Sequence, residues 1–382
     1  MEIVFVILAS VILTMISIPQ VIRLMSRRNL LDQPGGRKIH KNSVPSMGGI
    51  GIMMGFISGA IVIIYSGELG NFSYVLVSMG ILFVIGLLDD LKDLSAFQKL
   101  IGQLLAFFIV VILGDFRIYS FYGFLGVEEL PIWISYGLSV FLLVGLTNAY
   151  NLIDGLDGLA GILGLISTGL MAIWFGLTGF YIPSLLCLSL SGGIIAFLFY
   201  NWHPAKIFMG DTGSLPIGLF IATMAFYFIY ANGDLLDRDS AYRFAAPITG
   251  GMVMMVICCY DTLRVFVRRI RRGHSPFSPD KSHIHHFLMR MGNPHDQVAL
   301  MLGGLKLLFL ALMIVCKDMN DWLMFPVISI LAISLGSVIN VVTLRKVRAK
   351  VLSSPRVLSK SIYKIPKPIK EHYWEEKKIK EY

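Results

Sequence analysis

Long apolar segments separated by short polar connections dominate the hydrophobic pattern of the chain. Eleven segments approach the roughly 20 apolar residues that an α-helix needs to cross a hydrocarbon core about 30 Å thick. They lie at 2–22, 46–66, 72–88, 98–114, 131–147, 159–178, 183–200, 215–231, 244–263, 298–316 and 322–343. The pattern predicts an all-α polytopic membrane protein with about eleven transmembrane helices.

The composition supports this class. Of the 382 residues, 55% are hydrophobic and only 15% are charged, whereas soluble domains carry about 25% charged residues. A soluble multidomain enzyme, a disordered regulator and a secreted disulfide scaffold are therefore excluded. The four cysteines all lie inside apolar segments and show no metal-binding spacing.

Basic residues orient the predicted helices. Of the 33 Lys and Arg residues, 28 follow odd-numbered segments, counting those of the C-terminal tail. The positive-inside rule places these connections in the cytoplasm, with the N-terminus outside and the C-terminus inside. The net charge of +9 is thus interpreted as a topological signal and not as a nucleic-acid footprint. We predict a membrane domain over 1–343 and a basic cytoplasmic tail over 344–382, suited to anionic lipid.

The polar residues that could take part in catalysis or ligand binding lie mostly on the same predicted side. They are found in the connections 23–45, 89–98, 148–158, 201–214 and 264–297. The third segment ends in Asp89 and Asp90, followed by Asp93. Adjacent carboxylates repel each other, and a divalent cation or a cationic neighbour relieves that repulsion. A solvated helix end with Lys92 as counter-charge is the simpler alternative.

Four polar residues recur at every third position after the fifth segment, namely Asn148, Asn151, Asp154 and Asp157. A glycine follows each of the two aspartates, so the chain can leave helical geometry there. Amide and carboxylate groups on one short scaffold suit a base edge, a ribose or a hydrated metal. A helix cap would need only one such residue.

A further aspartate, Asp211, lies between Gly210 and Gly213 where the eighth segment begins. The free backbone N–H groups of a helix N-terminus favour an anionic ligand such as a phosphate. A carboxylate beside a phosphate usually has Mg²⁺ between the two anions. Capping of this helix by Asp211 is the alternative.

The connection 264–297 carries Arg264 and further arginines ahead of His283, His285 and His286. This arginine density suits a diphosphate, although topology alone would also explain it. Because the other polar residues are Asp and Asn, with no Cys nearby, a hard, oxygen-liganded ion is favoured over zinc. In the first connection, Lys41 and its basic neighbours suit a lipid headgroup or a substrate phosphate.

Taken in order, the runs 89–93, 148–157, 201–214 and 283–286 resemble the polyprenyl-phosphate N-acetylhexosamine-1-phosphate transferase family, glycosyltransferase family 4. Several signatures in sequence order are more specific than any one of them. The Asp-Asp-x-x-Asp pattern and the interrupted histidine motif are most similar to the UDP-N-acetylglucosamine branch. The branch that transfers phospho-N-acetylmuramoyl-pentapeptide in peptidoglycan synthesis is the alternative.

The resemblance implies transfer of a sugar 1-phosphate from a UDP-sugar to undecaprenyl phosphate, with release of UMP, to start a glycan such as teichoic acid or O-antigen. It implies a cleft on the cytoplasmic face of the plasma membrane, with Mg²⁺, or Mn²⁺ in its place, held by Asp211. Asp89, Asp90 and Asp93 are implied at the reacting phosphates. The implied substrate-binding residues are Lys41, Lys99, Asn148, Asn151, Asp154, Asp157, Asn201, Phe208, Arg264, His283, His285 and His286. The oligomeric state stays open, a homodimer included, and no nucleic-acid partner is expected.

The expected chemistry is mainly positioning and charge neutralisation. The second pKa of a phosphate monoester is about 6, so the lipid phosphate is already mostly dianionic at pH 7. Asp89 is therefore expected to organise the metal or orient the acceptor, with base and nucleophile roles as alternatives. A transporter is the competing class, since intramembrane carboxylates also mark ion pathways. However, the carboxylates gather at one face and the sequence shows no convincing inverted repeat.

Overall fold

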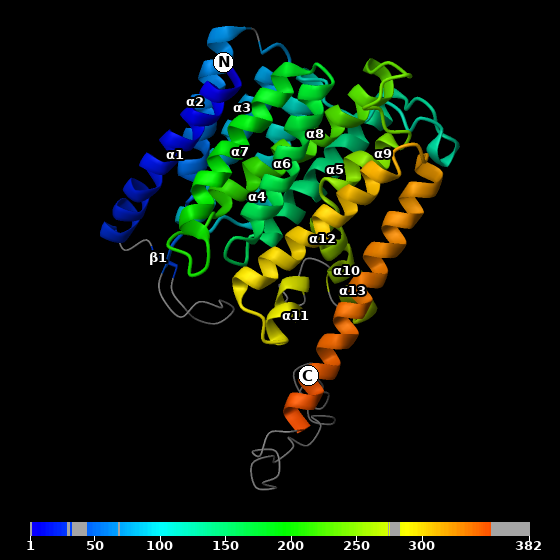
Figure 1. Ribbon diagram of the computed structural model, residues 1–382. Coiled ribbons are helices and arrows are strands. Elements are labelled where there is room, and N and C mark those ends of the chain that lie inside the picture. Colours follow the sequence, from blue (N-terminus) through cyan, green and yellow to red (C-terminus); the bar gives the residue numbers. More distant parts are fainter. Residues whose placement is uncertain are drawn as a thin grey trace, which may run out of the picture.

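The computed structural model describes residues 2–28, 31–32, 44–67, 69–273, 275 and 283–352, and most of these residues are helical (Figure 1). The first seven α-helices are α1 (Glu2–Arg27), α2 (Gly49–Ser66), α3 (Phe72–Lys92), α4 (Ala96–Phe108), α5 (Ile132–Ile153), α6 (Leu159–Leu177) and α7 (Tyr181–Asn201). The others are α8 (Asp211–Tyr230), α9 (Pro247–Val253), α10 (Val256–Arg271), α11 (Ile284–Arg290), α12 (His295–Val315) and α13 (Asp321–Leu352).

Short elements complete the described part of the chain. Strands β1 (Leu31–Asp32) and β2 (Val44–Pro45) pair antiparallel. The π-helical turns η1 (Ile109–Leu113) and η3 (Ala231–Leu235) extend α4 and α8, and η2 (Phe124–Gly126) is a 3₁₀ turn.

Nine helices of the described residues are long and apolar enough to cross a membrane, and the bent pair α9–α10 makes a tenth candidate. The prediction of an all-α polytopic membrane protein is therefore confirmed. Among the described residues, the predicted segment 46–66 corresponds to α2, a shorter apolar helix, and the segment 244–263 corresponds to the bent pair. The last helix, α13, continues to Leu352, beyond the predicted domain boundary at 343. The rest of the predicted tail lies outside the described residues.

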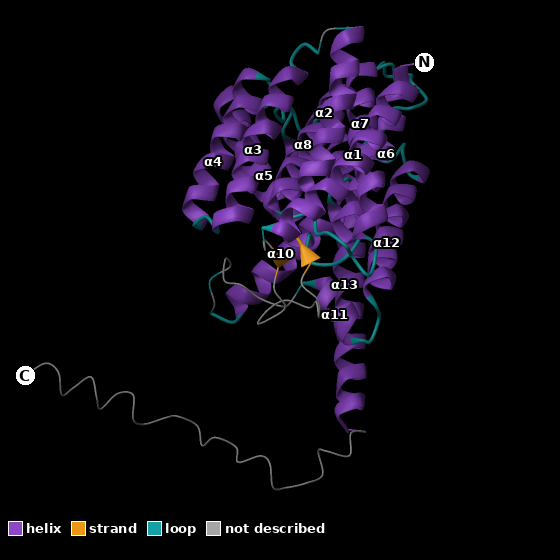
Figure 2. Ribbon diagram, turned by 90° about the vertical axis from the view of Figure 1, so that its left-hand side faces the viewer, coloured by secondary structure: helices purple, strands orange, loops and turns teal. Residues whose placement is uncertain are grey.

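The most buried helix of the bundle is α8. In its apolar window 89% of the residues are buried, against 28% for α1 and 22% for α13. It packs against α2, α3, α5, α6 and α9, and it lies in the middle of the bundle in both views (Figures 1 and 2). Its N-terminus, which begins at Asp211, is therefore surrounded by the ends of other helices.

The break between α9 and α10 bends the chain by 81°. Non-helical backbone at membrane depth needs internal polar partners, and Ser167 of α6 supplies one that Lys306 of α12 contacts in turn. Ser167 donates a hydrogen bond of 2.9 Å to the carbonyl of Met254 in the break. Lys306 donates to the Leu163 carbonyl at 2.8 Å and contacts the Ser167 hydroxyl. Beyond the break, α10 lies with α11 at the lower end of the bundle (Figure 2).

Candidate active site

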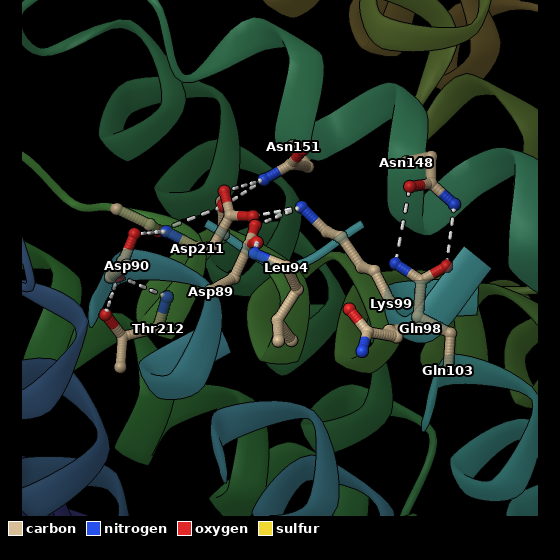
Figure 3. Close-up of polar contacts among 12 residues, drawn as sticks. Asp89, Asp90, Leu94, Gln98, Lys99, Gln103, Asn148, Asn151, Asp211 and Thr212 are labelled. Carbon is tan, nitrogen blue, oxygen red and sulfur yellow. Dashed lines mark hydrogen bonds and ion pairs between the residues drawn. The ribbon is translucent and has the colours of Figure 1, made fainter. Parts of the chain in front are cut away.

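The ends of four helices meet at one place, which we call the carboxylate junction: α3 and α5 end there, and α4 and α8 begin there (Figure 3). The local sequence makes a tight turn between α3 and α4. Asp93 ends α3 with a left-handed backbone, at φ 49°, and Ser95 starts α4 through a reciprocal capping box with Gln98, a strong helix-start signal. This turn brings Lys99 on α4 back towards Asp89 on α3.

Lys99 joins two carboxylates that lie far apart in the sequence. Its Nζ donates to Asp89 Oδ2 at 3.1 Å and also contacts Asp211 Oδ2 (Figure 3). The other oxygen of Asp89 accepts from the backbone N–H of Leu94 at 2.7 Å. The Lys99, Asp89 and Asp211 side chains are 18%, 18% and 21% exposed. They are therefore largely shielded, yet still reachable by a ligand.

The Asn151 amide supports Asp211 from the side of α5. It donates to Asp211 Oδ1 at 2.6 Å and to the Ser214 hydroxyl at 2.8 Å. One helical turn earlier, Asn148 exchanges two hydrogen bonds with Gln103 on α4, at 3.0 and 3.3 Å (Figure 3). The predicted asparagine pair thus lies at the junction, but only Asn151 reaches the carboxylates.

Asp90 turns away from Lys99 and holds the N-terminus of α8. Its Oδ1 accepts from the Asp211 backbone N–H at 3.0 Å, and its Oδ2 accepts from the Thr212 backbone N–H at 3.0 Å and from the Thr212 hydroxyl. Negative charge at this position is favoured by the helix dipole. The two neighbouring aspartates therefore have different surroundings.

The Asp154 carboxylate also lies against this helix start, where its Oδ2 accepts from the Gly210 N–H at 3.1 Å. Gly210 has φ +72°, and a Cβ there would lie 2.6 Å from Asp90 Oδ2, so only glycine fits. Removal from bulk water raises the pKa of Asp154 to about 8, helped by the charges of Asp211 and Asp90. Negative charge in this cluster is therefore only partly compensated by Lys99.

A divalent cation would supply the missing compensation. The donor atoms of Asp89, Asp90, Asp154 and Asp211 are all carboxylate oxygens, the hard ligands that Mg²⁺ prefers. Burial is the main cause of the raised pKa of Asp154, and the charges of Asp211 and Asp90 raise it further. The donor set thus fits Mg²⁺, with Asp89 and Asp211 as the two carboxylates that face each other across Lys99.

Beside this cluster, two predicted substrate-binding residues, Asn201 and Phe208, hold the connection 202–210 in place through hydrogen bonds. Asn201 is 4% exposed, and its amide accepts from Gly158 N–H at 2.9 Å and donates to the Ile207 carbonyl at 2.8 Å. The backbone of Phe208 donates to Pro45 and accepts from Gly48, at 2.9 and 2.8 Å. In this structure the amide of Asn201 therefore fixes the loop, and the main chain of Phe208 ties it to the segment before α2.

The histidine segment is attached to α10 by a carboxylate absent from the predicted set. Asp261 is fully buried and accepts from Arg264 Nη2 at 2.8 Å and from the Ile284 N–H at 2.9 Å. Its other oxygen lies 3.0 Å from His283 Nδ1. Arg264 and His283 are thus brought together, and the guanidinium also lies over the ring of Phe287.

His285 points from α11 towards the connection between α5 and α6. Its Nε2 lies 3.4 Å from the position that a Cβ on Gly155 would take, and its ring packs against those of His283 and His286. Burial, together with the neighbouring His286, lowers the pKa of His285 to about 3. This imidazole is therefore neutral at physiological pH and close to the Asp154–Asp157 loop.

The structure does not bring every predicted residue to the junction. Asp93 is exposed at the end of α3, so its catalytic role stays a prediction without a supporting contact. Lys41 lies outside the described residues. Asp157 is buried, with its Oδ2 2.7 Å from His203 Nδ1 and 3.3 Å from His295 Nδ1, and it lies in the same connection as Asp154.

Several contributors were missed by the sequence reasoning. Gln103 lies in no motif, and Thr212 lies in the run 201–214 without having been singled out, so their roles appear only once the helices are packed. Asp261 had a usable signal, because a carboxylate inside an apolar segment needs a partner and Arg264 follows at the i+3 position. His203 lies inside the run 201–214, and His295 follows a proline at the start of a helix, which is a weak signal.

Comparison with known proteins identifies the family. Residues 72–229 match the model of the family described as glycosyl transferase family 4, a range that contains the whole carboxylate junction. The histidine segment and α12 lie beyond the matched range.

Named relatives cover most of the chain. A probable undecaprenyl-phosphate N-acetylglucosaminyl 1-phosphate transferase of Bacillus subtilis is 35% identical over 85% of this chain and 88% of the relative. A decaprenyl-phosphate N-acetylglucosaminephosphotransferase of Mycolicibacterium smegmatis is 34% identical over 70% and 71%. An undecaprenyl-phosphate alpha-N-acetylglucosaminyl 1-phosphate transferase of Yersinia pestis is 28% identical over 69% and 70%. The chain therefore belongs to glycosyl transferase family 4, in the branch of the polyprenyl-phosphate N-acetylglucosamine-1-phosphate transferases.

Proposed function

We propose that this protein transfers N-acetylglucosamine 1-phosphate from UDP-N-acetylglucosamine to undecaprenyl phosphate. One observation carries the proposal, the meeting of Asp89, Lys99, Asn151 and Asp211 at one end of a membrane bundle. A diphosphate donor and a phosphate acceptor are both anionic. A site that receives them needs fixed donors and a cation, and this junction offers both.

The proposed transfer is direct and needs no covalent intermediate on the protein. An oxygen of the lipid phosphate attacks the phosphorus that carries the sugar, and the bond from this phosphorus to the bridging oxygen breaks, releasing UMP. The acceptor is already mostly dianionic at pH 7, since its second pKa is about 6, so no strong base is required. Lys99 lies where it can hold a non-bridging phosphate oxygen, and Asn151 orients Asp211.

Mg²⁺ belongs to this proposal, with Mn²⁺ as a substitute. Asp211 and Asp89 would hold the ion, which neutralises charge on the diphosphate during transfer. Asp90 keeps the backbone of Asp211 in place through its bond to the Asp211 N–H.

We place the site on the cytoplasmic face of the plasma membrane. The basic residues that set topology by the positive-inside rule include Arg264 and Lys99, and both lie at the site end of the bundle. This location suits the supply of substrates, because UDP-sugars are cytosolic and the phosphate of the lipid lies at headgroup depth. The product would start a cell-envelope glycan such as teichoic acid or O-antigen.

The donor can be identified directly. Purified protein with undecaprenyl phosphate and Mg²⁺ is supplied with single UDP-sugars, and UMP release is measured. We expect release with UDP-N-acetylglucosamine and little with UDP-N-acetylmuramoyl-pentapeptide. Release with the pentapeptide donor alone would overturn the donor assignment, and no release with any donor would overturn the enzymatic proposal.

A further inference from the structure

Three potential metal ligands from three separate elements converge beside the carboxylate junction. Asp157 comes from the α5–α6 connection, His203 from the connection after α7, and His295 is the first residue of α12. One ligand atom from each residue lies within 4.8 Å of the other two. None of the three side chains is bonded to Asp89, Lys99 or Asp211 in the contacts described above, so they form a separate cluster.

The distances in this cluster are close to those of a coordinated transition metal. Bonds of about 2.0–2.2 Å to His nitrogen and carboxylate oxygen place neighbouring ligand atoms of tetrahedral zinc about 3.3 Å apart. His295 Nδ1 lies 3.3 Å from Asp157 Oδ2. His203 Nδ1 lies at 2.7 Å, so this contact would need to open by about 0.6 Å. That movement is feasible because the His203 side chain is 38% exposed and lies on a connection.

The ligand chemistry favours zinc over magnesium. Imidazole nitrogen suits Zn²⁺ and related ions, whereas Mg²⁺ strongly prefers oxygen. Asp157 and His295 are 2% and 10% exposed, and the more exposed His203 gives an ion a path from solvent.

Without an ion, Asp157 Oδ2 accepts from the Ala205 N–H at 3.3 Å and lies 2.7 Å from His203 Nδ1. His295 Nδ1 lies 3.3 Å from the same oxygen. Both ring nitrogens therefore face one carboxylate oxygen, and a cation bound between them would accept a lone pair from each imidazole.

We propose that Asp157, His203 and His295 bind one divalent transition-metal ion of the Zn²⁺ class, separate from the proposed Mg²⁺ position at Asp211. Three protein ligands leave a fourth position for water. The ion would cross-link α12 to the connection that contains Asp154 and to the connection 202–210 that leads to Asp211, and so stabilise both. This proposal does not depend on the transferase reaction.

The test uses purified full-length protein that has been treated with a chelator. This protein is titrated with ZnCl₂ in the presence of excess Mg²⁺, and Zn²⁺ binding is measured by calorimetry. We expect one Zn²⁺ per chain. His203→Ala and His295→Ala should each weaken binding by more than the roughly 10–100-fold that loss of an outer-shell partner costs. The matched control is His286→Ala, which removes a histidine from the other cluster and should bind Zn²⁺ as the wild type does.

A second readout does not rely on the variants. Co²⁺ added to the wild-type protein should show the visible absorption of a four-coordinate ion, and His203→Ala, at the most exposed ligand, should lose it. Size-exclusion chromatography in detergent verifies that each variant is folded. The absence of stoichiometric Zn²⁺ binding, or binding that is lost in His286→Ala but kept in His295→Ala, would overturn the proposal.

Discussion

Asp90 and Thr212 are joined by two hydrogen bonds to a single carboxylate oxygen, one from the Thr212 backbone N–H at 3.0 Å and one from its hydroxyl. The other oxygen of Asp90 accepts from the Asp211 N–H. A side chain at the end of α3 therefore caps α8, the most buried helix of the bundle. The neighbouring Asp89 faces Lys99 instead. This contrast assigns an anchoring role to Asp90 and a substrate-facing role to Asp89.

Asp90→Asn should therefore affect stability as well as activity. An amide can accept at only one of its two ends, so at least one N–H at the start of α8 loses its acceptor, at a cost of about 1–3 kcal/mol. Thr212→Val removes only the hydroxyl and should cost less, about 0.5–1.5 kcal/mol. Unfolding in detergent measures both effects. Wild-type stability of Asp90→Asn would rule out the anchoring role.

Lys99→Gln should reduce turnover sharply, because it removes the cation between Asp89 and Asp211. Loss of one preorganised charge-stabilising donor typically lowers kcat by about 10²–10³-fold. The measurement is UMP release at saturating Mg²⁺. Lys92→Gln is the matched control, since Lys92 is exposed in the last turn of α3 and its loss should leave turnover nearly unchanged. Equal effects of the two substitutions would contradict the assignment.

The architecture was largely accessible from the sequence. Apolar segments of sufficient length predict membrane helices because backbone polar groups must be satisfied inside lipid. The 81° break after Val253 was not accessible, because its polar partner Ser167 comes from α6, and Lys306 of α12 supports it from behind. Ser167 and Lys306 lie in apolar segments of their own, and nothing in the local pattern connects them to Met254.

The composition of the site was easier to predict than its geometry. The recurrence of Asn151, Asp154 and Asp157 at every third residue indicated a functional loop, since one cap would not need them all. The direction of each side chain depends on packing, which local spacing does not encode. Asn201 illustrates this, because the resemblance implies a substrate-binding role and does not indicate that its amide is bonded to backbone groups of Gly158 and Ile207.

His285 should make stability depend on pH. Its pKa is about 3 in the folded protein and about 6.5 when unfolded, so the unfolded state binds more protons between these values. The stabilisation is complete above about pH 6.5 and is lost as the pH falls, by up to about 1.4 kcal/mol per unit. His285→Gln should reduce the slope of the unfolding midpoint between pH 7 and 5. An unchanged slope in His285→Gln would refute the buried neutral state.

Asp261→Asn should loosen the histidine segment. The buried carboxylate accepts from Arg264 and from the Ile284 N–H and contacts His283. Breaking a buried charged pair costs about 3–5 kcal/mol. We expect faster amide hydrogen exchange over 283–290 and a higher KM for the UDP-sugar. Asp296→Asn, at the start of α12, is the control, and exchange in Asp261→Asn that matches this control would exclude the positioning role.

The central claim is that a phosphorylated sugar, and not the sugar alone, moves to the lipid. UDP-N-acetylglucosamine with a ³²P label on the phosphorus next to the sugar distinguishes the two reactions when the wild-type protein is compared with Asp211→Asn. The account predicts that the label enters the lipid fraction while unlabelled UMP is released, and that Asp211→Asn abolishes both. Label that stays in UDP, or is released as inorganic phosphate without labelled lipid, would contradict it.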